Sequence, residues 1–230
     1  MSHFLAALFL AGSLSACGGG DGSRKAHPPA DQPVAGPPVP RSAEKRILFI
    51  GTSLTAGFGL EPEQAYPALI QLKIDSEALG YRVLNAGVSG QTSAGALSSI
   101  GWLLKIPPEV LVIETGANDG LRGQDPDSLR ANIQAIIDSA RARKADMTIL
   151  LVGMEAMRNL GTEYVTRFQR VYPELARANR ITLIPFLLQG VAGVDSLNQL
   201  YEMHPTAEGQ RIVAENVWKV LRRVLVGSRG

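Results

Sequence analysis

Short runs of consecutive apolar residues recur along the chain from residue 46 onward, and longer segments with apolar residues at helical spacing separate them. The runs predict strands at residues 46–51, 82–86, 110–114, 148–153 and 181–186, because a strand covered by helices on both faces is apolar throughout. The spacing between them predicts helices at residues 67–79, 93–104, 127–144, 164–178 and 207–225. This alternation indicates a single α/β domain, a three-layer α/β/α sandwich around a mainly parallel, doubly wound sheet of about five strands.

The first 43 residues do not share this pattern. Residues 4–14 are almost entirely apolar and small, which is typical of the core of a signal peptide and too short for a membrane-spanning helix. The segment LSAC at residues 14–17 resembles the bacterial lipobox, in which Cys17 would carry the lipid; an ordinary signal peptide with an incidental cysteine is the alternative. Residues 18–43 are rich in Gly, Pro and Ser and predict a disordered tether. The expected organisation is a lipoprotein signal peptide over 1–17, the tether over 18–43 and the folded domain over 44–230.

Composition narrows the classes of function. The chain has 230 residues, of which 45% are hydrophobic, and this suits one sizeable core rather than two. Its net charge of +2 is spread without basic runs, so the sequence predicts no nucleic-acid partner. The single cysteine excludes an intrachain disulfide, and two of the three histidines precede residue 44, so no His-rich metal site is expected.

Chemically rich segments follow the predicted strands or precede the last helix. Ligands of doubly wound domains bind beyond the carboxyl ends of the strands, so these segments are where a site is expected. They supply a serine (Ser53), a glycine-rich turn at residues 85–92, an amide (Asn118) and a histidine (His204). An acyl-transfer site needs these parts: a nucleophile, a base that takes its proton, and donors that hold the oxyanion.

Four stretches together resemble the SGNH (GDSL) hydrolase family, in particular its bacterial thioesterase I, lysophospholipase and arylesterase branch. They are GTSLTAG at 51–57, NAGVSGQTS at 85–93, ETGANDGLRG at 114–123 and HPTAEG at 204–209. The resemblance runs from about residue 46 to residue 225 and implies a flavodoxin-like SGNH hydrolase domain. It implies Ser53 as nucleophile, His204 as base, and an oxyanion hole formed by the backbone N–H groups of Ser53 and Gly90 and the side chain of Asn118. It calls for no metal and no organic cofactor.

Two positions depart from the family pattern. Thr52 replaces the acid of the usual Gly-Asp-Ser, and we expect a small effect because threonine can still hydrogen-bond in the turn. Tyr201 stands where the family has the aspartate that orients the catalytic histidine. Three interpretations follow: Glu202 or Asp195 orients His204, a backbone carbonyl orients it in a Ser–His dyad, or the protein is a weakened or inactive relative.

The expected substrate is a small ester or thioester, with acyl groups favoured because residues 155–163 and 190–200 bring apolar side chains toward the site: Met154, Met157, Leu160, Val191, Val194 and Leu197. Removal of acetyl groups from carbohydrate is the alternative reaction. A non-catalytic envelope lipoprotein that binds acyl or glycan ligands is the alternative from another class. The N-terminal segments predict a location in the bacterial cell envelope, lipid-anchored through Cys17 at the periplasmic face of the inner or outer membrane, or secreted.

Overall fold

The structure is a computed structural model and describes residues 45–200 and 203–227. Five strands form a parallel sheet in the order β2-β1-β3-β4-β5: β1 (Lys45–Gly51), β2 (Tyr81–Gly87), β3 (Val110–Ile113), β4 (Thr148–Gly153) and β5 (Thr182–Phe186). Every predicted strand is confirmed to within one or two residues. The central strands β1 and β3 are almost fully buried, as their continuous apolar sequence predicts.

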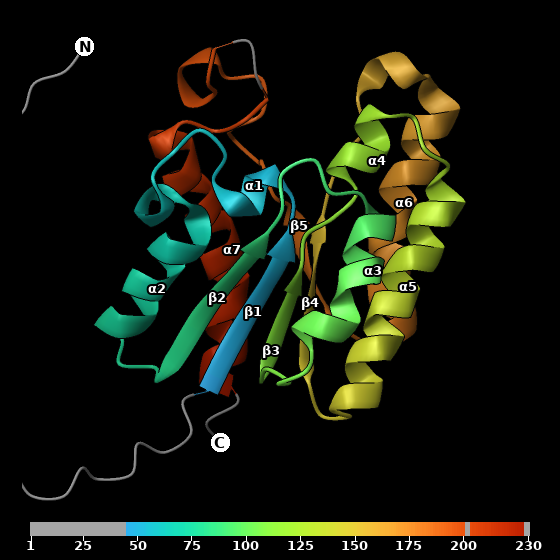
Figure 1. Ribbon diagram of the computed structural model, residues 1–230. Coiled ribbons are helices and arrows are strands. Elements are labelled where there is room, and N and C mark those ends of the chain that lie inside the picture. The colour runs from blue at the N-terminus through green and yellow to red at the C-terminus, as the bar shows by residue number, and fades with distance from the viewer. Residues whose placement is uncertain (1–44, 201–202, 228–230) are drawn as a thin grey trace, which may run out of the picture. The chain divides into compact units, whose positions relative to one another are not determined.

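Helices cover both faces of the sheet, which confirms the three-layer sandwich (Figure 1). The helices α2 (Tyr66–Ser76) and α7 (Ala207–Gly227) pack together on one face. On the other face α5 (Pro126–Arg143) packs between α3 (Ser93–Leu103) and α6 (Thr162–Asn179). Within the residues described, no helix has the length and apolarity needed to cross a membrane.

The packing of α5 shows how the sequence specifies this layer. Its fully buried side chains recur every three or four residues, at Leu129, Ile133, Ile136, Ile137 and Ala140, and they form one apolar stripe toward the sheet. Each large aliphatic side chain buried in this way contributes roughly 1.5–3 kcal/mol. Pro126 occupies the first turn, where its missing N–H costs nothing, and Arg141 and Arg143 lie in the last turn.

The structure differs from the sequence prediction in two respects. Helix α2 ends at Ser76 rather than at residue 79, because Ala78 adopts a left-handed conformation (φ 49°) and the N–H of Leu79 bonds back to the carbonyl of Ile74. Leu79 continues the apolar pattern because it packs into the core after the helix has ended. Five short helices were not predicted: α1 (Ser53–Ala56), α4 (Ala117–Leu121), η1 (Pro62–Gln64), η2 (Arg158–Leu160) and η3 (Asp195–Leu197).

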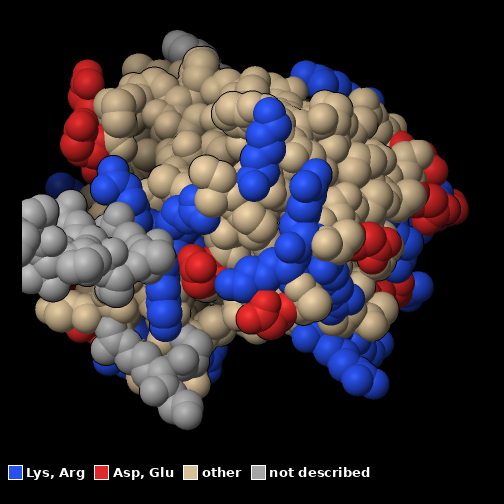
Figure 2. Space-filling model, turned by 60° about the horizontal axis from the view of Figure 1, so that its bottom comes forward, with Lys and Arg blue, Asp and Glu red and all other residues tan. Residues whose placement is uncertain are grey.

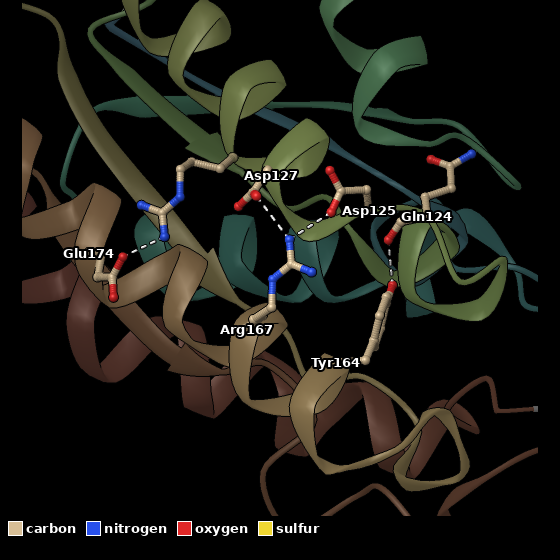
Figure 3. Close-up of polar contacts among 7 residues, drawn as sticks. Gln124, Asp125, Asp127, Tyr164, Arg167 and Glu174 are labelled. Carbon is tan, nitrogen blue, oxygen red and sulfur yellow. Dashed lines mark hydrogen bonds and ion pairs between the residues drawn. The ribbon is translucent and has the colours of Figure 1, made fainter.

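Polar contacts tie α6 to the beginning of α5 (Figure 3). Arg167 donates to both Asp125 and Asp127 at 2.9 Å, Tyr164 Oη donates to the carbonyl of Gln124 at 2.7 Å, and Arg130 pairs with Glu174. Exposed ion pairs of this kind contribute little to stability individually. They fix the first turns of α6, which directly follow residues 154–161 at the carboxyl end of the sheet.

Candidate active site

The site lies where the strand order reverses. The strand order 2-1-3-4-5 is the flavodoxin-like one, in which β1 continues to β2 on one side and the chain crosses to β3 on the other. A crevice forms between the loops that follow β1 and β3, because these loops turn to opposite faces of the sheet. Ser53 begins α1 directly after β1, and Asn118 lies in α4 after β3.

The structure brings Ser53 and His204 together across 151 residues of sequence. The distance from His204 Nε2 to Ser53 Oγ is 2.8 Å, a hydrogen bond suited to transfer of the hydroxyl proton. The ring of Phe58 packs against the imidazole at 4.7 Å between centroids and an angle of 38°. Ser53 and His204 are each only partly buried, so a substrate can reach the pair.

The segment that carries His204 is folded back on itself. The N–H of Gln199 donates to the carbonyl of His204 at 2.8 Å, and Asn198 forms an antiparallel bridge with Pro205. The side chain of Gln199 donates to the carbonyls of Phe58 and Pro205, at 2.8 and 3.0 Å. Gln199 therefore connects the loop of the nucleophile to the loop of the base, a role that the sequence did not indicate.

We expect Gln199→Ala to lower kcat for ester hydrolysis about ten-fold with a small change in KM. The substitution removes two hydrogen bonds, each contributing roughly 1 kcal/mol, and so loosens the position of His204 relative to Ser53. Steady-state kinetics with a soluble nitrophenyl ester measures the effect. Gln124→Ala is the matched control, because Gln124 accepts the hydrogen bond from Tyr164 through its backbone carbonyl (Figure 3). Equal losses in both variants would contradict the role of Gln199.

The turn after β2 presents Gly90 to the site. The N–H of Gln91 bonds to the carbonyl of Val88 at 3.1 Å, and Gly90 has a φ of 77° at the third position of this turn. That conformation favours glycine. The side chain of Arg122 stabilises the turn by donating a hydrogen bond to the Gly90 carbonyl at 3.1 Å. Asn118 Nδ2 donates one hydrogen to the carbonyl of Gln91 at 3.0 Å, and the amide nitrogen carries a second hydrogen. Gly90, Asn118, Ser53 and His204 all line one cavity.

A buried carboxylate, Asp119, follows Asn118 in α4. Asp119 is 1% exposed and accepts hydrogen bonds from the backbone N–H and the hydroxyl of Ser93, at 2.9 and 2.5 Å. The hydroxyl of Ser93 also accepts from Asn132 at 2.9 Å. Asp119 thus joins α4 to the first turn of α3, where a negative charge is favoured by the helix dipole.

A second buried carboxylate, Glu114, holds the turn of the nucleophile. It accepts hydrogen bonds from the backbone N–H of Thr52 at 2.7 Å and from the hydroxyls of Thr52 and Thr55, each at 2.9 Å. Gly51 has no room for a side chain, because a Cβ there would lie 2.6 Å from a Glu114 oxygen. Thr52 therefore hydrogen-bonds in the turn as expected, and it does so as a donor to the carboxylate that lies beside it.

The stability of the wild type is expected to fall with rising pH relative to that of Glu114→Gln. Burial raises the pKa of the Glu114 carboxyl, and the hydrogen bonds from Thr52 and Thr55 oppose this only in part. The folded state therefore holds the proton more tightly than the unfolded chain, whose glutamates titrate near a pKa of about 4.3. Stability is lost as the pH rises from that value through the folded pKa. Denaturant unfolding of both proteins between about pH 4 and pH 8 measures the difference, and parallel pH profiles would contradict it.

The cavity beside the Ser53–His204 pair has a volume of about 1250 Å³. Two of the six apolar residues expected around it, Met154 and Met157, line it, together with Phe58, Leu121, Leu188 and Met203. The other four, Leu160, Val191, Val194 and Leu197, are not among its lining residues, and Val191 is instead fully buried in the core. The space exceeds the range of roughly 300–1000 Å³ usual for small-ligand pockets and is large enough for an acyl group.

The remaining expected site residues fall in different places. Asp195 lies exposed in η3 and lines the same cavity as His204. Cys17, Tyr201 and Glu202 lie outside the described residues. Among residues 45–200 and 203–227, no group of three or more His, Cys, Asp or Glu side chains is placed to hold a metal ion.

Comparison with known proteins agrees with this geometry. The GDSL-like Lipase/Acylhydrolase family matches residues 49–212. The chain is 39% identical over 186 residues to Esterase TesA of Pseudomonas aeruginosa, covering 80% of this chain and 92% of that protein. It is 31% identical over 182 residues to Thioesterase 1/protease 1/lysophospholipase L1 of Escherichia coli K12, covering 79% and 85%.

Solved structures give the same result. The crystal structure of TesA superposes with a TM-score of 0.74 at 39% identity, covering 78% of this chain and 99% of that one. The psychrotrophic esterase EstA from Pseudoalteromonas, in a structure inhibited by monoethylphosphonate, superposes with a TM-score of 0.74 at 29% identity, covering 79% and 98%. The chain therefore belongs to the GDSL-like lipase/acylhydrolase family and is a serine ester hydrolase of the SGNH type.

Proposed function

We propose that this protein hydrolyses acyl esters and thioesters through a covalent acyl-Ser53 intermediate. The observation that carries the proposal is the 2.8 Å hydrogen bond between Ser53 Oγ and His204 Nε2 at the edge of the large, mainly apolar cavity. Ser53 Oγ attacks the carbonyl carbon while its proton passes to His204. The oxyanion accepts hydrogen bonds from the N–H groups of Ser53 and Gly90 and from the Asn118 amide.

Collapse of the tetrahedral intermediate that carries this oxyanion breaks the bond to the leaving group. His204 returns the proton to the departing alcohol or thiol, and the acyl group stays on Ser53. Water then attacks the acyl-Ser53 carbonyl, gives its proton to His204, and the second collapse releases the carboxylic acid as the proton returns to Ser53. Each proton taken up by His204 is thus returned within the cycle, and no external acid or base is consumed.

The chemistry of the cavity favours acyl groups over acetyl groups. Three methionines line it together with other large apolar residues, among them Phe58, Leu121 and Leu188, and they offer adaptable apolar contact along a flexible chain. We expect kcat/KM for nitrophenyl esters to rise from acetate toward medium chain lengths. A maximum at acetate would instead favour the removal of acetyl groups from carbohydrate.

A fluorophosphonate probe tests the covalent step. Labelled protein is digested, and the modified residue is identified by mass spectrometry. The expected label is on Ser53, whose hydroxyl is the one activated by His204. Absence of a label in folded protein at any pH would overturn the catalytic proposal and favour a binding protein with a relic site.

What orients His204 is settled by comparing Asp195→Asn with Glu202→Gln. Loss of the orienting carboxylate in other triad enzymes lowers kcat by about 10⁴-fold. A drop of that kind in one variant identifies the carboxylate that orients His204. Unchanged kcat in both variants identifies a dyad oriented by a backbone group.

We also propose that Cys17 carries the lipid anchor and that the protein resides in the bacterial cell envelope. The support is the LSAC segment at residues 14–17 after an apolar stretch, with a Pro- and Gly-rich segment behind it. Two or three acyl chains hold a protein on a membrane, whereas one alone does so only reversibly. Mass spectrometry of the mature protein tests this, and an unmodified Cys17 would overturn it.

A further inference from the structure

Exposed cations gather at the end of the sheet opposite the active site. They come from the start of β1 and from the ends of four helices, and we refer to Lys45, Lys105, Arg143, Arg180 and Arg223 as the basic end. Figure 2 shows the molecule with this end turned forward, and Lys and Arg side chains spread over it. The cations are far apart in the sequence but meet here because all five strands are parallel and the long helices return antiparallel to them.

Carboxylates at the same end do not cancel this charge. Glu77 pairs with a further cation, Arg222, at 2.8 Å, and Glu109 pairs with Lys144 at 3.7 Å. Asp75 and Asp146 are the other acidic residues in these turns. Helix dipoles account for part of the distribution, because cations are favoured at helix C-termini, but they do not account for Lys45 at the start of a strand.

Two large apolar side chains are exposed beside these cations. Trp102 is 68% exposed and Ile106 is 66% exposed, and Lys105 lies between them in the turn after α3. Indole rings beside basic residues are typical of protein surfaces that sit in the headgroup region of a membrane. A nucleic acid would bind the cations through its phosphates but would offer no apolar contact to the side chain of Ile106. The combination of cations and exposed apolar side chains therefore favours a lipid surface.

The point at which the N-terminal segment joins the domain also favours a lipid surface as the partner. Lys45 is the first residue of β1, so residues 1–44 join the domain at the basic end. A chain lipidated at Cys17 would therefore be attached to the domain from this end through residues 18–44. We infer that the basic end docks on an anionic lipid surface, with Trp102 and Ile106 among the headgroups and the active site turned away. The inference rests on the proposed lipid anchor only for this tethering step.

This orientation specifies where the substrate comes from. Helix α5 has 18 residues and runs between the two ends of the domain, which separates them by about 27 Å. The Ser53–His204 pair would then lie too far from the supporting bilayer to reach the ester bonds of its lipids. The preferred substrates are therefore esters and thioesters that arrive from the aqueous phase.

Vesicle binding of the full chain carrying Cys17→Ser tests the inference without a covalent anchor. We expect binding to vesicles with roughly 30% phosphatidylglycerol, weak binding to pure phosphatidylcholine, and loss of binding at high salt. The triple variant K105Q/R143Q/R180Q should lower the partition coefficient about 100-fold. The control R170Q/R211Q/K219Q has the same net charge change on other parts of the helices and should lower it only a few-fold.

Tryptophan fluorescence supplies a second measurement. Trp218 is 7% exposed and should not respond, so a blue shift on binding anionic vesicles reports Trp102 and should vanish in W102F. Equal weakening by both triple variants, no shift, or a preference for duplex DNA over anionic vesicles would each overturn the inference. Hydrolysis of a soluble nitrophenyl ester, measured in the same samples, should be unchanged in the K105Q/R143Q/R180Q variant. That measurement tests the proposed catalysis separately. A protein that binds anionic vesicles but shows no ester hydrolysis would contradict the proposed catalysis and still support the docking surface.

Discussion

His204→Ala is expected to lower kcat for a soluble nitrophenyl ester by about 10⁴- to 10⁶-fold. The substitution removes the imidazole that lies 2.8 Å from Ser53 Oγ and takes its proton, and the neutral hydroxyl is a weak nucleophile. KM should change little, because the apolar cavity proposed to bind the acyl group is left in place. Active-site titration and steady-state kinetics give kcat and KM separately.

The double variant Ser53→Ala/His204→Ala distinguishes a catalytic unit from two independent contributions. When two residues act in the same step, removing either one already abolishes that step, and removing the second costs little more. The double variant should therefore be no slower than either single variant by more than a few-fold. Multiplying losses would contradict a shared proton-transfer step. Thermal unfolding of all three variants should stay close to that of the wild type, because both side chains are partly exposed.

The strands and long helices were predictable because their signals are local and repeated. Strand β1 is buried from Ile47 onward and reads there as a continuous apolar run, and α5 repeats its apolar stripe over five turns. The short helices α1 and α4 have four and five residues, which is less than the length over which a 3.6-residue period can be seen. Their existence follows from the turns at the ends of β1 and β3, and those turns depend on tertiary contacts.

The candidate site was predictable where its residues directly follow strands and not elsewhere. Ser53 and Asn118 follow β1 and β3, so their proximity follows from the topology. Gln199 reaches the carbonyl of Phe58 across 141 residues, and no local pattern shows such a contact. The sequence does indicate a structural role for Glu114, because a carboxylate that ends a buried apolar strand needs hydrogen-bond donors around it.

The clustering of charge on the surface could not be predicted from the sequence. A net charge of +2 without basic runs gives no sign of a charged surface. The basic end forms because the start of β1 and the ends of four helices each contribute one of its five cations near the same edge of the sheet. Charge that is dispersed along the chain can therefore be concentrated in space, and only the topology determines where.

Asn118→Ala is expected to lower kcat by 10²- to 10³-fold, equivalent to about 2.7–4 kcal/mol of lost transition-state stabilisation, with little change in KM. Its amide has one hydrogen on the Gln91 carbonyl, at 3.0 Å, and the second is the one proposed to meet the oxyanion. That contact strengthens only as negative charge develops on the carbonyl oxygen, so its loss acts on kcat rather than on ground-state binding.

Asn118→Asp is the sharper comparison, because it keeps the size of the side chain while replacing the donor with a negative acceptor. Its kcat should fall below that of Asn118→Ala, since the carboxylate repels the oxyanion as well as failing to donate to it. The order wild type, Ala, Asp in kcat at constant KM distinguishes stabilisation of the oxyanion from mere support of the turn at Gln91. If Asn118 only supported that turn, both substitutions would lower the melting temperature together with kcat, and the aspartate would bring no additional loss of kcat.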